Sequence, residues 1–87
     1  STEDQVWENA VKERTIKALI SYLETYPNGL YAADARAKRA ILRLDDELYD
    51  AALKMGTESA FKQFLIDFPG HSREADMRQE LKRRFGS

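Results

Sequence analysis

The chain has 87 residues, which fits one small domain with a thin core, because a domain of this size buries only about 60–65% of its unfolded surface. Apolar residues make up 43% and charged residues 33%, with 14 basic against 15 acidic side chains, a balance typical of a helical protein and not of a disordered one. The absence of cysteine excludes disulfides and thiolate metal sites, and leaves the compartment open between the cytoplasm and the periplasm.

Three helices are predicted in the first half of the chain. The first begins near Glu3 and has an apolar face formed by Val6, Trp7, Ala10 and Val11. The second follows the capping residue Thr15 and ends at Pro27-Asn28-Gly29, because proline disfavours helical backbone before it and glycine permits a left-handed turn. The third begins near Tyr31 and ends near Leu44. No stretch alternates with a period of two, so no strand is predicted.

The second half of the chain repeats the first. Residues 3–39 align without a gap with residues 45–81, which gives a period of about 42 residues, within the range of about 20–50 that is typical of stacked repeats. The aligned pairs include Ala10/Ala52, Thr15/Thr57, Ala18/Ala60, Leu23/Leu65, Pro27/Pro69, Asp34/Asp76, Trp7/Tyr49, Tyr22/Phe64 and Tyr26/Phe68. We therefore predict an all-α fold, a single domain over residues 1–87 made of two tandem three-helix units, residues 3–44 and 45–85.

The junction between the two units has two interpretations. A break at Leu44-Asp45-Asp46 is the expected one, because aspartate favours a helix cap over a helix interior. However, neither glycine nor proline occurs between Leu30 and Met55, so the third and fourth helices can also form one rod. In that case we expect each unit to need a partner chain to cover its core, as in a domain-swapped dimer.

The pattern of the first unit resembles the tetratricopeptide-like helical repeats of bacterial proteins. The resemblance rests on Trp7-x-x-Ala10, on Thr15-x-x-Ala18-Leu19-x-x-Tyr22-Leu23, and on Tyr26-Pro27-Asn28-Gly29-x-Tyr31-Ala32-x-x-Ala35. It implies a helical stack that binds proteins or peptides, often as an accessory region of a larger protein. The period is longer than that family's usual unit, so the residues of its concave peptide groove are not carried over to this chain.

Residues with potential chemistry are few and scattered. His71 is the only histidine, and after Pro69-Gly70 we interpret it as a solvated turn residue and not as a base or a metal ligand. Asp34 and Asp76 are expected in the first turns of their helices, where the helix dipole favours a negative charge. The basic run Lys82-Arg83-Arg84 is expected at a solvated helix C-terminus, where the same dipole favours cations. We predict no catalytic, cofactor-binding or metal site.

The predicted function is therefore binding. Most aromatic residues must form the core of so small a domain, but the polar tips of Tyr31 and Tyr49 suggest a rim or an interface. With Arg36, Arg73 and Arg78 they form the predicted interaction surface. The expected partner is a protein or peptide, with a second copy in a homodimer as one option, and no nucleic acid and no membrane insertion are expected.

Two alternatives to a partner-binding module remain from the sequence: a structural spacer and a self-association domain. The exposure of apolar residues on the third predicted helix distinguishes a partner-binding module from a spacer. Exposure of Ala32, Ala35 and Ile41 would favour a partner, whereas their burial would favour a spacer.

Overall fold

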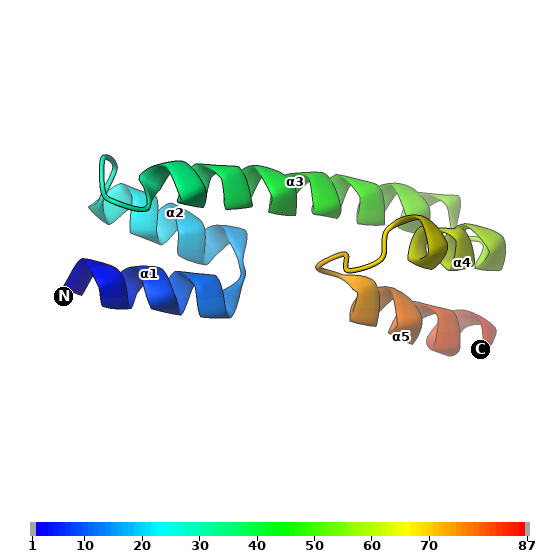
Figure 1. Cartoon of the computed structure of the whole chain (residues 1–87). Coiled ribbons are helices and arrows are strands. Elements are labelled where there is room, and N and C mark those ends of the chain that lie inside the picture. The colour runs from blue at the N-terminus through cyan, green and yellow to red at the C-terminus, as the bar shows by residue number, and fades with distance from the viewer. Residues whose placement is uncertain (1, 87) are drawn as a thin grey trace. The chain divides into compact units, whose positions relative to one another are not determined.

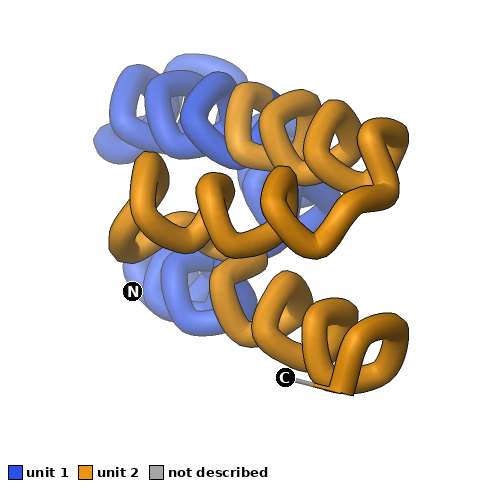
Figure 2. The backbone as a smooth tube through the Cα atoms, turned by 90° about the vertical axis from the view of Figure 1, so that its right-hand side faces the viewer, with its two compact units in different colours: residues 1–43 blue, residues 44–87 orange. Residues whose placement is uncertain are grey.

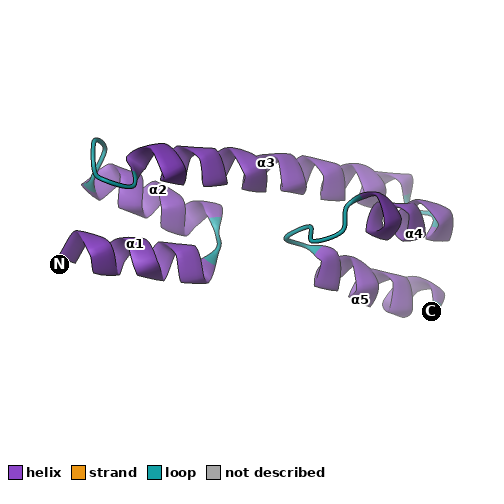
Figure 3. Ribbon diagram, in the orientation of Figure 1, coloured by secondary structure: helices purple, strands orange, loops and turns teal. Residues whose placement is uncertain are grey.

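The computed structural model describes residues 2–86 and contains five α-helices, with no strand among those residues (Figures 1 and 3). They are α1 (Thr2–Glu13), α2 (Ile16–Thr25), α3 (Ala32–Met55), α4 (Glu58–Asp67) and α5 (Glu74–Phe85). The predicted all-α class is confirmed. The chain divides into two compact units, unit 1 (residues 1–43) and unit 2 (residues 44–87), shown in blue and orange in Figure 2.

The expected break at Leu44-Asp45-Asp46 is absent, because α3 continues through these residues as one helix of 24 residues. The acidic pair finds partners outside its own helix instead of capping it. The Asp45 carboxylate accepts the Ser72 N–H at 3.1 Å, and Asp46 lies 3.9 Å from the Arg73 guanidinium. These tertiary contacts replace the local capping role, so the intrinsic preference of aspartate does not end the helix.

Unit 1 closes its own core with α1, α2 and the first part of α3. Tyr22 and Ala35 have no exposed surface, and Leu19 is nearly as deeply buried. The other buried members of this cluster are Trp7, Ala10, Leu23 and Ala32. The side chains that cover this core therefore come from the unit itself.

Unit 2 closes a second core with the rest of α3, α4 and α5. Phe61 and Met77 have no exposed surface, and Tyr49 and Phe64 are nearly as deeply buried. Ala52 and Leu81 complete this cluster. The expectation that a continuous α3 would leave each unit in need of a partner chain over its core is therefore wrong.

The turns of the two units use the same hydrogen bonds at aligned positions. Thr15 Oγ1 accepts the Ala18 N–H at 3.1 Å, and Thr57 Oγ1 accepts the Ala60 N–H at 3.1 Å. α2 and α4 also end alike, on Tyr26 and Phe68 with closely similar backbone angles. The threonine caps explain where both helices begin, because the hydroxyl satisfies an otherwise unpaired N–H of the first turn.

Arg14 follows α1 in a left-handed conformation, with φ of 56°. The equivalent position after α3 is Gly56, with φ of 67°. This left-handed conformation costs a residue with a side chain roughly 1–2 kcal/mol. Glycine avoids that cost, but part of the gain is lost because glycine has more conformational freedom in the unfolded chain. We expect Arg14→Gly to raise the free energy of unfolding by about 0.5–1 kcal/mol in urea denaturation. Gly56→Ala is the matched reversal and should lower it by a similar amount; an Arg14→Gly variant less stable than the parent would contradict the argument.

Candidate functional site

Tyr31, predicted at an interaction rim, is half-buried against α1 in unit 1. Its ring stacks on Trp7 with centroids 5.1 Å apart and ring planes inclined by 2°. Its hydroxyl donates to Asp4 at 2.7 Å, and this bond, together with burial, raises the pKa of the Tyr31 hydroxyl. The hydroxyl therefore stays protonated and ties the start of α3 to α1.

Tyr49 lies in the core of unit 2 and not at a rim, because it is only 2% exposed. The Arg73 guanidinium carbon lies 3.8 Å above the centre of its ring, a cation–π contact. Burial is the main cause that raises the pKa of the Tyr49 hydroxyl. Tyr49 and Arg73 align with Trp7 and Tyr31 of unit 1, so in both units a planar group covers the aromatic ring at this position.

The two remaining predicted arginines are exposed but have partners within their own units. Arg36 donates to the Pro27 carbonyl at 2.8 Å, and Arg78 donates to Glu74 at 3.0 Å. Glu74 also accepts the Gly70 N–H, and these two bonds lower the pKa of its carboxyl. Of the five predicted residues, the structure brings together only Tyr49 and Arg73, and all five support contacts inside a unit.

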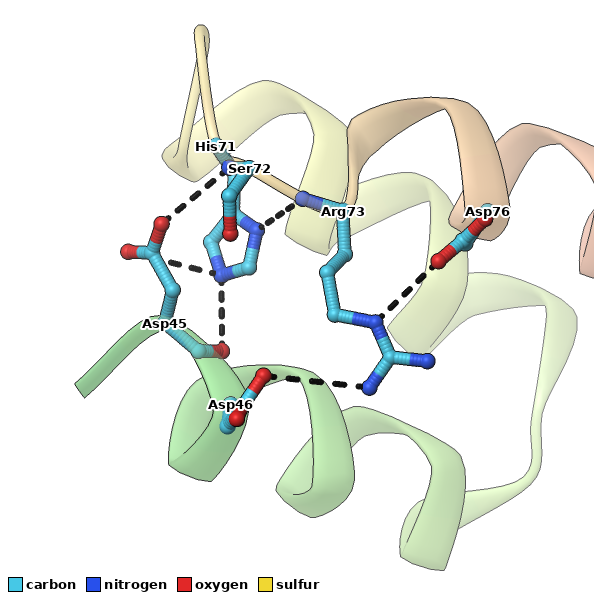
Figure 4. A network of polar contacts seen from close by, with 6 residues as sticks. All are labelled: Asp45, Asp46, His71, Ser72, Arg73 and Asp76. Atoms are coloured by element: carbon cyan, nitrogen blue, oxygen red, sulfur yellow. Dashed lines mark hydrogen bonds and ion pairs between the residues drawn. The ribbon is translucent and has the colours of Figure 1, made fainter. Parts of the chain in front are cut away.

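His71, interpreted from the sequence as a solvated turn residue, is buried and only 8% exposed. Figure 4 shows its polar contacts with Asp45 and Arg73. The Arg73 N–H donates to His71 Nδ1 at 2.9 Å, so Nδ1 carries no proton and Nε2 donates to the Asp45 carbonyl at 2.8 Å. The ring also meets Phe64 edge to face, with centroids 4.6 Å apart. The interpretation as a turn residue missed that the imidazole joins the turn before α5 to α3.

In unit 1 a tyrosine hydroxyl makes the equivalent connection. The Tyr22 hydroxyl donates to Glu3 Oε2 at 2.9 Å and accepts the Tyr31 N–H at 3.0 Å. Glu3 Oε2 also accepts the Leu30 N–H at 2.9 Å, as Asp45 accepts the Ser72 N–H. Burial and the Glu3 bond raise the pKa of the Tyr22 hydroxyl, which therefore remains a donor.

An exchange of two residues links these arrangements. Tyr22 and Gly29 of unit 1 stand where unit 2 has Phe64 and His71. In unit 1 the polar group is the Tyr22 hydroxyl on α2, and Gly29 leaves room for it. In unit 2 the polar group is the His71 imidazole on the turn before α5, beside the phenyl ring of Phe64. The aligned sequence contains this paired exchange, and it is the signal that could have identified His71 as buried.

Each network joins the helices of its own unit. Both ring nitrogens of His71 are engaged with backbone groups, so the ring has no free nitrogen to act on a substrate. Over residues 2–86, no group of three or more histidine or acidic residues is placed to hold a metal ion. Within the same residues, no helix is both long and apolar enough to cross a membrane.

Exposed aliphatic side chains lie on α3, and of these only Ile41 was considered in the sequence analysis. Ile41 is 60% exposed and Leu44 is 55% exposed, a large exposure for branched aliphatic side chains three residues apart on one helix. Ala32 and Ala35 are buried in the core of unit 1. The criterion that separates a partner-binding module from a spacer therefore has a divided result, because Ile41 is uncovered while both alanines are covered.

Comparison of the chain with models of protein families, with curated proteins and with solved structures gives no match. A functional conclusion therefore rests on the residues of this chain and on their geometry.

Proposed function

We propose that this chain is a non-catalytic protein–protein interaction module, an accessory region of a larger bacterial protein. The exposed aliphatic residues of α3 carry the proposal. Ile41 and Leu44 remain in water although both units have closed their own cores. Burying such side chains against a partner gains about 25 cal/mol per Å² of apolar surface, which favours an interaction at this place.

Two tandem three-helix units in a tetratricopeptide-like stack are the architecture that we propose for the module. Supporting it are the backbone bonds around the helix ends, which recur at aligned positions of the two units. For example, Gly29 N–H to Tyr26 O recurs as His71 N–H to Phe68 O, and Ala35 N–H to Tyr31 O recurs as Met77 N–H to Arg73 O. The bacterial setting and the accessory role follow from the resemblance of the Tyr26–Ala35 segment to such repeats.

A structural spacer is the second candidate, and the burial of Ala32 and Ala35 favours it. Both alanines lie in the closed core, so the start of α3 is used within unit 1. A spacer needs no partner, and its exposed aliphatic residues would be incidental. The two candidates differ in whether anything covers Ile41 and Leu44 in the working protein.

Site-specific photo-crosslinking distinguishes the two candidates. A benzophenone side chain would replace Ile41 in one variant and Ile66, which is 70% exposed on α4, in a control. Irradiation is carried out in the cells that make the protein. We expect adducts heavier than the 10.0 kDa chain from position 41 and few from position 66. No adduct at position 41, or equal labelling at both positions, would contradict the interaction function and support the spacer.

A further inference from the structure

Apolar residues extend along α3 on a side that the core of unit 1 does not use and that the core of unit 2 uses only at Leu48. In unit 1 they are Ala37, Ala40 and Ile41, all exposed. In unit 2 they are Leu44, Leu48, Ala51 and Met55, of which only Leu48 packs partly against the core. Steps of three and four residues place each set on one face of the helix. We call these sets the unit 1 stripe and the unit 2 stripe.

The charges beside the two stripes have opposite signs. The part of α3 in unit 1 carries Arg36, Lys38, Arg39 and Arg43 and only one acid, Asp34. The part in unit 2 carries four acids and only one base, Lys54. Asp45 and Asp46 contact the turn before α5, so Glu47 and Asp50 are the acids that lie exposed beside the stripe. The helix dipole does not explain this division, because it acts on the first and last turns and would favour the opposite order.

We propose that two copies of this chain pair through α3 in antiparallel orientation, with the unit 1 stripe of each copy on the unit 2 stripe of the other. This deepens the proposed interaction function and rests on it, by naming the partner as a second copy. An antiparallel pair brings the basic part of one helix beside the acidic part of its partner, and aliphatic residues meet in between. A parallel pair would instead place like charges together.

A second copy is the occupant that the residues favour, because the two complementary surfaces belong to one helix. In a two-fold dimer the same contact occurs twice, so Ile41 and Leu44 of both copies become covered together. The cores need no rearrangement, since Ala35 and Tyr49 are buried in their own units and stay so.

The first test measures mass by light scattering over a concentration series of the whole chain. We expect the mass to rise from 10.0 kDa toward twice that value. Leu44→Asp should raise the dissociation constant about tenfold or more, because it places a charge in the centre of the contact. Ile66→Asp is the matched control, since Ile66 is more exposed than Leu44 but lies on α4. A mass that stays at the value of a single chain, or equal effects of the two variants, would overturn the proposal.

Charge exchange tests the antiparallel order. One variant carries Lys38→Glu and Arg43→Glu, which gives both parts of α3 a net negative charge. The other carries Glu47→Lys and Asp50→Lys, which gives both parts a net positive charge. Each alone should remain a monomer with unchanged helix content by circular dichroism, and an equimolar mixture should form a heterodimer. Two folded variants that dimerise alone as well as they do in the mixture would overturn the proposal.

Photo-crosslinking from position 41 separates this inference from the proposed function. Adducts of twice the chain mass support self-pairing. Adducts that contain only a different protein overturn self-pairing while the interaction function stands. The absence of any adduct contradicts both.

Discussion

Replacing Gly29 by alanine is expected to destabilise the protein by about 2–4 kcal/mol. A Cβ atom at this position would overlap Glu3 Oε2 and lie 2.7 Å from the Tyr22 hydroxyl and 2.9 Å from Tyr26 Cβ. The new methyl group must therefore displace the carboxylate that accepts the Tyr22 hydroxyl and the Leu30 N–H. This loss is a large part of the roughly 4–13 kcal/mol expected for a chain of this length.

Urea denaturation measures this effect, followed by tryptophan fluorescence for unit 1 and by circular dichroism for the whole chain, because Trp7 is the only tryptophan. Gly70→Ala provides the control. Gly70 has φ of 79°, but no neighbouring atom lies within 4 Å of where its Cβ would be, so the substitution adds backbone strain without displacing a neighbour. We expect a loss of only about 1 kcal/mol there. Equal losses in the two variants would show that the space at Gly29 is not what requires glycine.

The helices follow directly from local sequence patterns. Thr15 separates two apolar faces and caps the second helix, and proline and glycine mark the turn at Pro27-Asn28-Gly29. The continuous α3 could not be assigned in the same way, because Asp45 is a poor interior residue by its own preference. Its carboxylate accepts the Ser72 N–H, 27 residues along the chain, and this bond favours Asp45 inside a continuous helix. Local patterns contain no information on such a distant contact.

The buried networks and the exposed stripe differ in how far the sequence predicts them. Burial of His71 depends on the fit between its ring and Phe64, which becomes visible only when the two units are aligned and the exchange with Tyr22 and Gly29 is noticed. The hydroxyl of Tyr49 suggested a place at a rim, yet its ring is covered by Arg73. Side-chain contacts of this kind depend on three-dimensional packing, so a single sequence does not specify them.

A second prediction concerns the polar connection in unit 2, where His71→Gly should cost about 3–4 kcal/mol. The substitution removes a buried ring and leaves the Arg73 N–H and the Asp45 carbonyl without their present partners. Phe64→Tyr should cost about 1–3 kcal/mol, because its hydroxyl would point into a site that the imidazole already fills. Each single change therefore breaks the arrangement in a different way.

Combining the two changes should restore stability, since together they reproduce the pair found at Tyr22 and Gly29. The introduced hydroxyl can accept the Arg73 N–H, as the Tyr22 hydroxyl accepts the Tyr31 N–H. We expect the double variant to be about 2 kcal/mol more stable than the sum of the two losses predicts. Adding Asp45→Glu should recover more, because Glu3 reaches the Tyr22 hydroxyl with one methylene more than aspartate has.

Hydrogen exchange of the unit 2 amides provides the measurement, with Trp7 fluorescence as a check on unit 1. The restored variants should protect the Arg73 N–H again, which a general gain in stability would not do selectively. Strictly additive losses would mean that the hydroxyl and the imidazole do not occupy equivalent sites. Recovery in the double variant would show that one polar connection, carried by either the second helix or the turn, is what each unit requires to fix its third helix on its first.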